Sequence, residues 1–92
     1  MQQTVSIIIS GKVQGVFFRQ STKEKALELG LTGKVSNLPD GTVHIVATGS
    51  PDALELLSAW CQQGPPKANV FSVTIEKLPL QVFEKFMIDR FK

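Results

Sequence analysis

The hydrophobic pattern of this chain predicts strand, helix, strand, strand, helix, strand and then a short last strand. A strand is indicated where apolar and polar residues alternate, because successive side chains of a strand point to opposite faces. A helix is indicated where apolar residues recur every three or four positions. The predicted strands are Thr4 to Ser10, Leu31 to Asn37, Val43 to Thr48, Val70 to Ile75 and Phe86 to Phe91.

The first helix is predicted from about Phe18 to Leu29, with one apolar face turned to the core. Ser21 and Glu24 have the spacing of a capping box, which would start the helix slightly later. Gly30 is placed to end the helix in a left-handed conformation, which glycine adopts without steric cost.

Turn-forming residues mark the other boundaries. The segment Leu38-Pro39-Asp40-Gly41 favours a tight reversal, so the second and third strands are predicted to form a hairpin. Ser50 and Pro51 are residue types preferred at the N-cap and at the first helical position, and they begin the second helix. The run Gly64-Pro65-Pro66 ends it.

These elements fit one arrangement economically. Two right-handed β-α-β units interleave to give an α+β fold of the ferredoxin-like type, in which an antiparallel sheet carries both helices on one face. A chain of 92 residues is enough for one compact domain and too short for two, so we predict a single domain over residues 1–92. This fold supports many functions and does not identify an activity.

Composition and net charge limit the possible ligands and the cellular compartment. The net charge of +2 suits a small anionic ligand, but it is too weak to indicate binding to nucleic acid or to a membrane. No apolar run approaches the roughly 20 residues of a membrane span, and the first residues lack a signal-peptide pattern. Cys61 is the only cysteine, which excludes an internal disulfide and a thiolate zinc cluster. We therefore expect a cytoplasmic protein, most simply a monomer.

Candidate chemistry is concentrated between Gly11 and Arg19, where the first strand leads into the first helix. A glycine-containing loop at this place can aim several backbone N–H groups inward as an anion nest. The helix start adds unpaired donors and a partial positive charge. Arg19 can add a bidentate, charge-assisted grip on a phosphate or carboxylate. These residue types alone fit an oxyanion site and a plain connection with a solvated arginine equally well.

The order of residues in this loop resembles the signature of the acylphosphatase family. The matching residues are Gly11-Lys12-Val13-Gln14-Gly15-Val16, then an aromatic residue, then Phe18-Arg19. The resemblance continues along the chain through Ala26, Leu29-Gly30-Leu31, Gly33, Val35, Asn37, Asp40-Gly41, Val43, Gly49, Gly64-Pro65-Pro66 and Ala68. Members of this family have the ferredoxin-like fold, and they hydrolyse the carboxyl–phosphate bond of acyl phosphates without a metal. The resemblance therefore implies a small-molecule acyl phosphate as substrate, with no cofactor.

The resemblance also implies roles for individual residues. The arginine that matches Arg19 binds the phosphate, and the asparagine that matches Asn37 orients the attacking water. Backbone amides complete the phosphate cradle, and the residues expected to supply them are Gln14, Gly15, Val16, Phe17, Phe18 and Arg19. An acyl phosphate leaves as a stable carboxylate, so a strong general acid is unnecessary. Because an amide is no useful base near pH 7, we expect a phosphate oxygen of the substrate to take the proton of the water.

Two features depart from the usual pattern of the family. Lys34 stands where tryptophan is common, and the chain has no tyrosine, although many members end the last strand with one. Neither position matches a catalytic residue, so we expect effects on packing and surface. Lys34 is also a candidate to alter the charge of the site's rim and the preferred acyl group.

Two other function classes compete with the enzyme. The same loop could hold a phosphorylated ligand or a carboxylate without reaction, and acylphosphatase-like domains do occur within larger carbamoyl-transfer proteins. RNA-recognition modules use a similar sheet, but the first and third strands here lack the exposed aromatics of those modules, so no nucleic acid is expected. His44 is expected to be a solvated strand residue, and Cys61 a buried core thiol.

Overall fold

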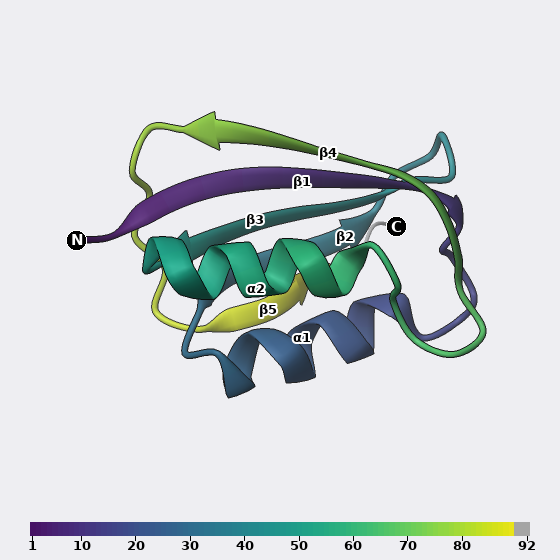
Figure 1. The fold of residues 1–92 in the computed structure, drawn as a ribbon, viewed down its shortest axis with the longest axis horizontal. Helices are drawn as coiled ribbons and strands as arrows, with labels where there is room; N and C mark the ends of the chain where they lie inside the picture. Colours follow the sequence, from purple (N-terminus) through teal and green to yellow (C-terminus); the bar gives the residue numbers. More distant parts are fainter. Residues whose placement is uncertain (90–92) are drawn as a thin grey trace.

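The structure is a computed structural model that describes residues 1–89. Along the chain, strands and helices follow in the predicted order (Figure 1). The elements are β1 (Gln3–Lys12), α1 (Phe18–Glu28), β2 (Thr32–Asn37), β3 (Val43–Gly49), α2 (Pro51–Cys61), β4 (Asn69–Leu78) and β5 (Phe86–Asp89).

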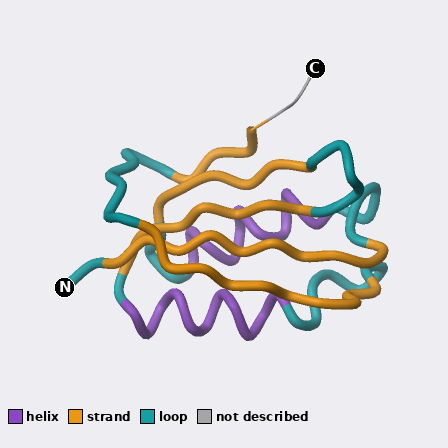
Figure 2. The backbone as a smooth tube through the Cα atoms, turned by 90° about the horizontal axis from the view of Figure 1, so that it is seen from above, coloured by secondary structure: helices purple, strands orange, loops and turns teal. Residues whose placement is uncertain are grey.

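The five strands form one sheet in the order β4-β1-β3-β2-β5, and both helices cover the same face of it (Figure 2). β1 lies antiparallel between β3 and β4, and β2 lies antiparallel beside β3. This is the predicted ferredoxin-like α+β fold, extended by one strand.

The fifth strand corrects one part of the prediction. β5 pairs with β2 in parallel, so the sheet is mixed, not antiparallel throughout. β4 and β5 lie at opposite edges, and the chain therefore crosses the whole width of the sheet between them. The part of the last strand predicted beyond Asp89 lies outside the described residues.

The segment that makes this crossing, residues 79–85, is fixed to the sheet by hydrogen bonds. The backbone N–H of Gln81 donates to Thr4 Oγ1 at 2.9 Å, and Thr48 Oγ1 donates to the Gln81 carbonyl at 2.8 Å. Further along, the N–H of Gly33 donates to the Lys85 carbonyl at 3.1 Å. These contacts set the position at which β5 meets β2.

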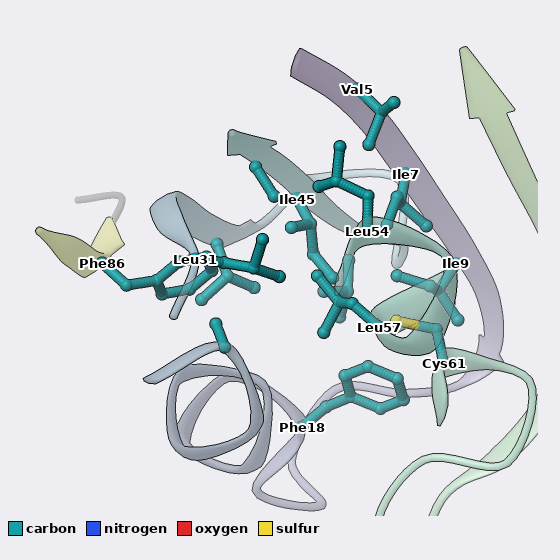
Figure 3. Close-up of a cluster of buried hydrophobic side chains, with 14 of the residues drawn as sticks. Val5, Ile7, Ile9, Phe18, Leu31, Ile45, Leu54, Leu57, Cys61 and Phe86 are labelled. Carbon is teal, nitrogen blue, oxygen red and sulfur yellow. The ribbon is translucent and has the colours of Figure 1, made fainter. Parts of the chain in front are cut away.

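The apolar core lies between the sheet and the two helices (Figure 3). In β1, Ile7 and Ile9 are fully buried and face the helices, as the alternation predicts. Ile8 points to the other face and is 38% exposed, while Thr4 and Ser6 on that same face are buried. Part of this second face is therefore covered as well.

The predicted end of α1 at Gly30 and the predicted start of α2 at Ser50 are confirmed. Gly30 has φ 73°, and the N–H groups of Gly30 and Leu31 donate to Leu27 and Ala26, which closes α1 as a Schellman motif. Ser50 caps α2 by accepting from the N–H of Ala53 at 3.2 Å. 

The capping box predicted at Ser21 and Glu24 is wrong. α1 already begins at Phe18, and the N–H of Ser21 donates to the carbonyl of Phe17 as the first bond of the helix. The loop before the helix, not a side-chain cap, fixes where the helix starts.

Candidate active site

The loop between β1 and α1 is anchored in the core by three side chains. Val13, Val16 and Phe18 are buried, whereas Phe17 between them is 75% exposed. Figure 3 shows Phe18 pointing from the start of α1 into the core. Its ring packs on Trp60, with the ring centroids 5.5 Å apart and a tilt of 59°. The backbone of the loop is thus held in place from the core side.

Two residues of this loop have a left-handed backbone. Gly15 has φ 73°, and Phe17 has φ 64°. Within residues 1–89, Phe17 is the only residue other than glycine with a positive φ. A left-handed conformation costs an ordinary residue about 1–2 kcal/mol. The fold therefore holds Phe17 in a conformation that a glycine would adopt more easily.

A row of backbone donors faces no protein acceptor in this loop. The N–H groups of residues 14–20 donate no hydrogen bond to any part of the chain that the structure describes. Phe17 is the N-cap of α1, and no side chain caps the helix. Unpaired N–H groups at a helix start carry partial positive charge, so this segment is suited to bind an anion.

A pocket of about 470 Å³ lies beside these donors. Its lining residues are Val13, Gly15, Phe17, Phe18, Arg19, Gln20, Asn37 and Ile88. Arg19 is the only charged side chain in this lining, and it forms no ion pair with residues 1–89. Because no carboxylate among the described residues competes for the guanidinium, Arg19 is available to an anionic ligand.

Asn37 brings β2 into the same pocket. It is the last residue of β2 and lies on the same face of the strand as buried Val35, which is the face covered by the helices. Its Oδ1 atom is buried and has no hydrogen-bond partner within residues 1–89. An unpaired buried amide oxygen is costly, so the lack of a protein partner marks Asn37 as a candidate functional residue.

Gln14 links the loop to the strand end that carries Asn37. Its Nε2 donates to the carbonyls of Leu38 and Thr42, at 2.8 Å and 2.9 Å. Thr42 is itself held by Asp40, whose Oδ1 accepts from the N–H and the hydroxyl of Thr42. These bonds lower the pKa of Asp40. The loop and the β2–β3 turn are thereby fixed relative to each other.

The structure thus brings most of the predicted site residues together. Gly15, Phe17, Phe18, Arg19 and Asn37 all line the pocket, although they come from the loop, the helix and the second strand. The side chain of Gln14 serves as the link just described, and that of Val16 points into the core, which leaves only their backbone N–H groups for a ligand.

Sequence reasoning missed three residues that line the pocket, and it gave Lys34 a role at the rim that the pocket lining does not support. Val13, Gln20 and Ile88 line the pocket, and Ile88 reaches it only because β5 pairs in parallel with β2. No sequence signal identified that neighbour. Lys34 does not line the pocket, since it alternates with Gly33 and Val35 and therefore lies on the face of the sheet away from the helices. Its expected effect on the rim is not supported.

The other titratable candidates lie away from the pocket lining. His44 is partly buried on the face opposite the helices, and burial, followed by the charge of Lys34, lowers its pKa. Cys61 is a buried free thiol, as predicted, and burial raises its pKa to about 12. Residues 1–89 contain no cluster of three or more His, Cys, Asp or Glu that could hold a metal. No helix in the described part of the chain is long and apolar enough to cross a membrane.

The fold and the site define a small α+β protein with a pocket beside unpaired backbone N–H groups at the start of its first helix. A sequence model of the acylphosphatase family matches residues 5–88. The chain therefore belongs to the acylphosphatase family.

Individual relatives agree with this assignment in sequence and in structure. An acylphosphatase of Marinobacter nauticus is 56% identical over 73 residues, which cover 79% of each chain. The structure of an acylphosphatase from Coxiella burnetii superposes with a TM-score of 0.93 at 42% identity, over 96% of this chain and 93% of the other. That of the Bacillus subtilis acylphosphatase gives 0.92 at 32% identity, over 97% and 99%. The predicted family and fold are confirmed, and the roles of Arg19 and Asn37 stay predictions.

Proposed function

We propose that this chain hydrolyses the carboxyl–phosphate bond of acyl phosphates, giving a carboxylate and inorganic phosphate. Family membership supports this activity. The observation that carries the proposal is the pocket itself, where the unpaired N–H groups of residues 14–20, the unpaired Arg19 and the buried oxygen of Asn37 meet.

In the proposed mechanism, the phosphate group is held by the loop and by Arg19. The N–H groups and the guanidinium stabilise charge on the phosphoryl oxygens, which is the main requirement of phosphoryl transfer. Donors that are already in place cost little reorganisation when the reaction occurs. The packing of Phe18 on Trp60 and the hydrogen bond from Gln14 to Leu38 hold the loop in place, which supports this pre-organised arrangement.

Asn37 is proposed to position the attacking water. Its Oδ1 accepts a hydrogen bond from the water, whose oxygen then attacks phosphorus opposite the acyl oxygen. The bond from phosphorus to the acyl oxygen breaks, and the acyl group leaves as a carboxylate. The pocket lining holds no histidine or carboxylate among the described residues that could act as base. The water's proton therefore passes to a phosphoryl oxygen, which completes inorganic phosphate.

The direct test is hydrolysis of benzoyl phosphate by the purified wild-type protein in the presence of a chelator. The proposal predicts turnover well above the spontaneous rate. An absence of turnover, with inorganic phosphate still bound in calorimetry, would instead support a non-catalytic phosphate-binding module.

Two substitutions test the separate roles. For Asn37→Ala we expect a large fall in kcat, with affinity for inorganic phosphate mostly kept, because only the water loses its partner. For Arg19→Ala we expect loss of both phosphate binding and turnover. Asn69→Ala and Lys34→Ala are matched controls, since both residues lie outside the pocket lining. Both substitutions should leave kcat and the affinity for inorganic phosphate unchanged. Unchanged turnover in Asn37→Ala would remove that residue from the mechanism.

We also propose that the protein acts as a cytoplasmic monomer of one domain, on a small molecule, and not on nucleic acid or membranes. The free buried thiol of Cys61 is compatible with a reducing compartment. Size-exclusion chromatography with light scattering tests the monomer, and a mass of twice 10.1 kDa would contradict it.

A further inference from the structure

Phe17 combines three features at the mouth of the pocket. It lines the pocket, its side chain is 75% exposed, and it adopts φ 64°, where glycine would be easier to accommodate. Exposure means that the ring adds little to the core. Strained residues persist where the surrounding structure holds them, and they are enriched at functional sites. An aromatic ring kept here under strain therefore suggests a contact outside the chain.

A polar atom of Asn37 lies at the buried side of the pocket, and the ring of Phe17 lies at its exposed side. Asn37 Oδ1 is fully buried, so a water that it holds lies at the inner wall. In-line displacement places the leaving group on the side of phosphorus opposite that water. The acyl group must then point outward, toward the rim where Phe17 is exposed.

The size of the pocket leaves space for more than phosphate. Its volume of about 470 Å³ lies in the range of sites that hold whole organic ligands. Its apolar lining includes Phe17 and the partly buried Ile88, which come from opposite ends of the chain. No charged side chain other than Arg19 belongs to the lining within residues 1–89, so nothing there favours a charged acyl group.

We propose that Phe17 is a specificity-determining residue, which contacts the acyl group and makes the enzyme prefer acyl phosphates with an aromatic or branched apolar acyl part. This inference rests on the proposed function. Aromatic pairs and apolar burial supply the preference, while the loop and Arg19 bind the phosphate that all acyl phosphates share.

The expected kinetic signature is a change in KM without a change in kcat. Contact with an acyl group is made equally in the bound substrate and in the transition state, so it acts as uniform binding. Replacing Phe17 by Ala should raise the ratio of the KM for benzoyl phosphate to the KM for acetyl phosphate about tenfold. The ratio is the readout because the backbone N–H of Phe17 belongs to the proposed cradle that both substrates share, whereas only benzoyl phosphate has a group that reaches the ring.

A second variant separates the ring from the backbone. Phe17→Gly also removes the ring, but it relieves the left-handed strain, so both variants should show the same shift in benzoyl-over-acetyl preference. Phe71→Ala is the matched control, because Phe71 is 88% exposed and lies on β4 outside the pocket lining.

The outcomes distinguish this inference from the proposed function. A wild type that hydrolyses neither acyl phosphate contradicts the proposed function itself. A wild type that hydrolyses both, with the same preference ratio in Phe17→Ala and Phe17→Gly, overturns the role of Phe17 alone. A shift in Phe17→Gly only would assign the effect to the backbone, because Phe17→Ala also removes the ring, and would likewise overturn the role of Phe17. An equal shift in Phe71→Ala would show that the ratio reports general apolar surface.

Discussion

Gly15 and Gly30 are a matched pair for testing whether the shape of the loop backbone is required for activity. Both have φ 73°, and a Cβ added to either would meet no atom within 4 Å. Gly15 lines the pocket, whereas Gly30 ends α1 at its far end. Substitution by Ala therefore introduces the same backbone strain at both places, but only Gly15 lies in the proposed phosphate cradle.

The expected magnitudes follow from this geometry. A left-handed alanine costs about 1–2 kcal/mol, and a domain of this size loses about 4–8 °C in Tm per kcal/mol. Both variants should therefore melt at lower temperature than the wild type. In Gly15→Ala, relief of the strain moves the neighbouring N–H groups. A hydrogen bond to a charged group contributes about 1.5–3 kcal/mol, so loss of one such bond lowers kcat/KM about 10- to 100-fold.

The assay is benzoyl phosphate hydrolysis at 25 °C, beside thermal melts followed by circular dichroism. We expect Gly30→Ala to keep the activity of the wild type despite its lower Tm. If Gly15→Ala keeps the same kcat/KM as Gly30→Ala, the conformation of Gly15 is not needed, and the argument from converging backbone donors is wrong.

Three further predictions follow from single contacts. Gln14→Ala removes two hydrogen bonds, but the carbonyls of Leu38 and Thr42 each keep one backbone donor. The free energy of unfolding, measured by urea titration, should therefore fall by about 1–3 kcal/mol. The kcat should also fall, while the affinity for phosphate changes less. Folding lowers the pKa of His44, so the unfolded chain binds more protons near the ordinary histidine pKa of 6.5, and stability should fall as pH drops below about 7. His44→Gln should flatten this pH dependence in thermal melts at pH 5–8. An unaltered pH dependence in the variant would contradict the prediction. With its pKa raised to about 12, Cys61 should resist iodoacetamide at pH 8 in the folded protein and react in urea, as read by mass spectrometry; rapid alkylation without urea would disprove its burial.

Sequence alone predicted the elements whose signals are local. Alternation identified β1 and β4, and Gly30 identified the end of α1, because each depends on residues that are neighbours in the chain. The loop from Gly11 to Arg19 was recognised for the same reason. The second site residue, Asn37, was reached only through the family resemblance, since a residue beside a Pro-Asp-Gly turn has an ordinary structural explanation.

The features that sequence could not predict depend on distant partners. Alternation predicts that β5 is a strand, but it does not state which neighbour the strand pairs with or in which direction. The contribution of Ile88 to the pocket follows from that pairing. The link from Gln14 to the carbonyl of Leu38 was equally invisible, because a glutamine in a loop carries no signal for a partner 24 residues away.

The position of β1 inside the sheet has a consequence for how the protein is made. Every residue proposed to bind phosphate or water lies between Gln14 and Asn37, a segment that is synthesised before β4. β1, from which the loop emerges, pairs on one side with β4, which begins only at Asn69. Pairing over such a separation forms late, because the intervening chain must first be closed. A growing chain on the ribosome can therefore expose all of the proposed phosphate- and water-binding residues before β1 has its partner strand β4.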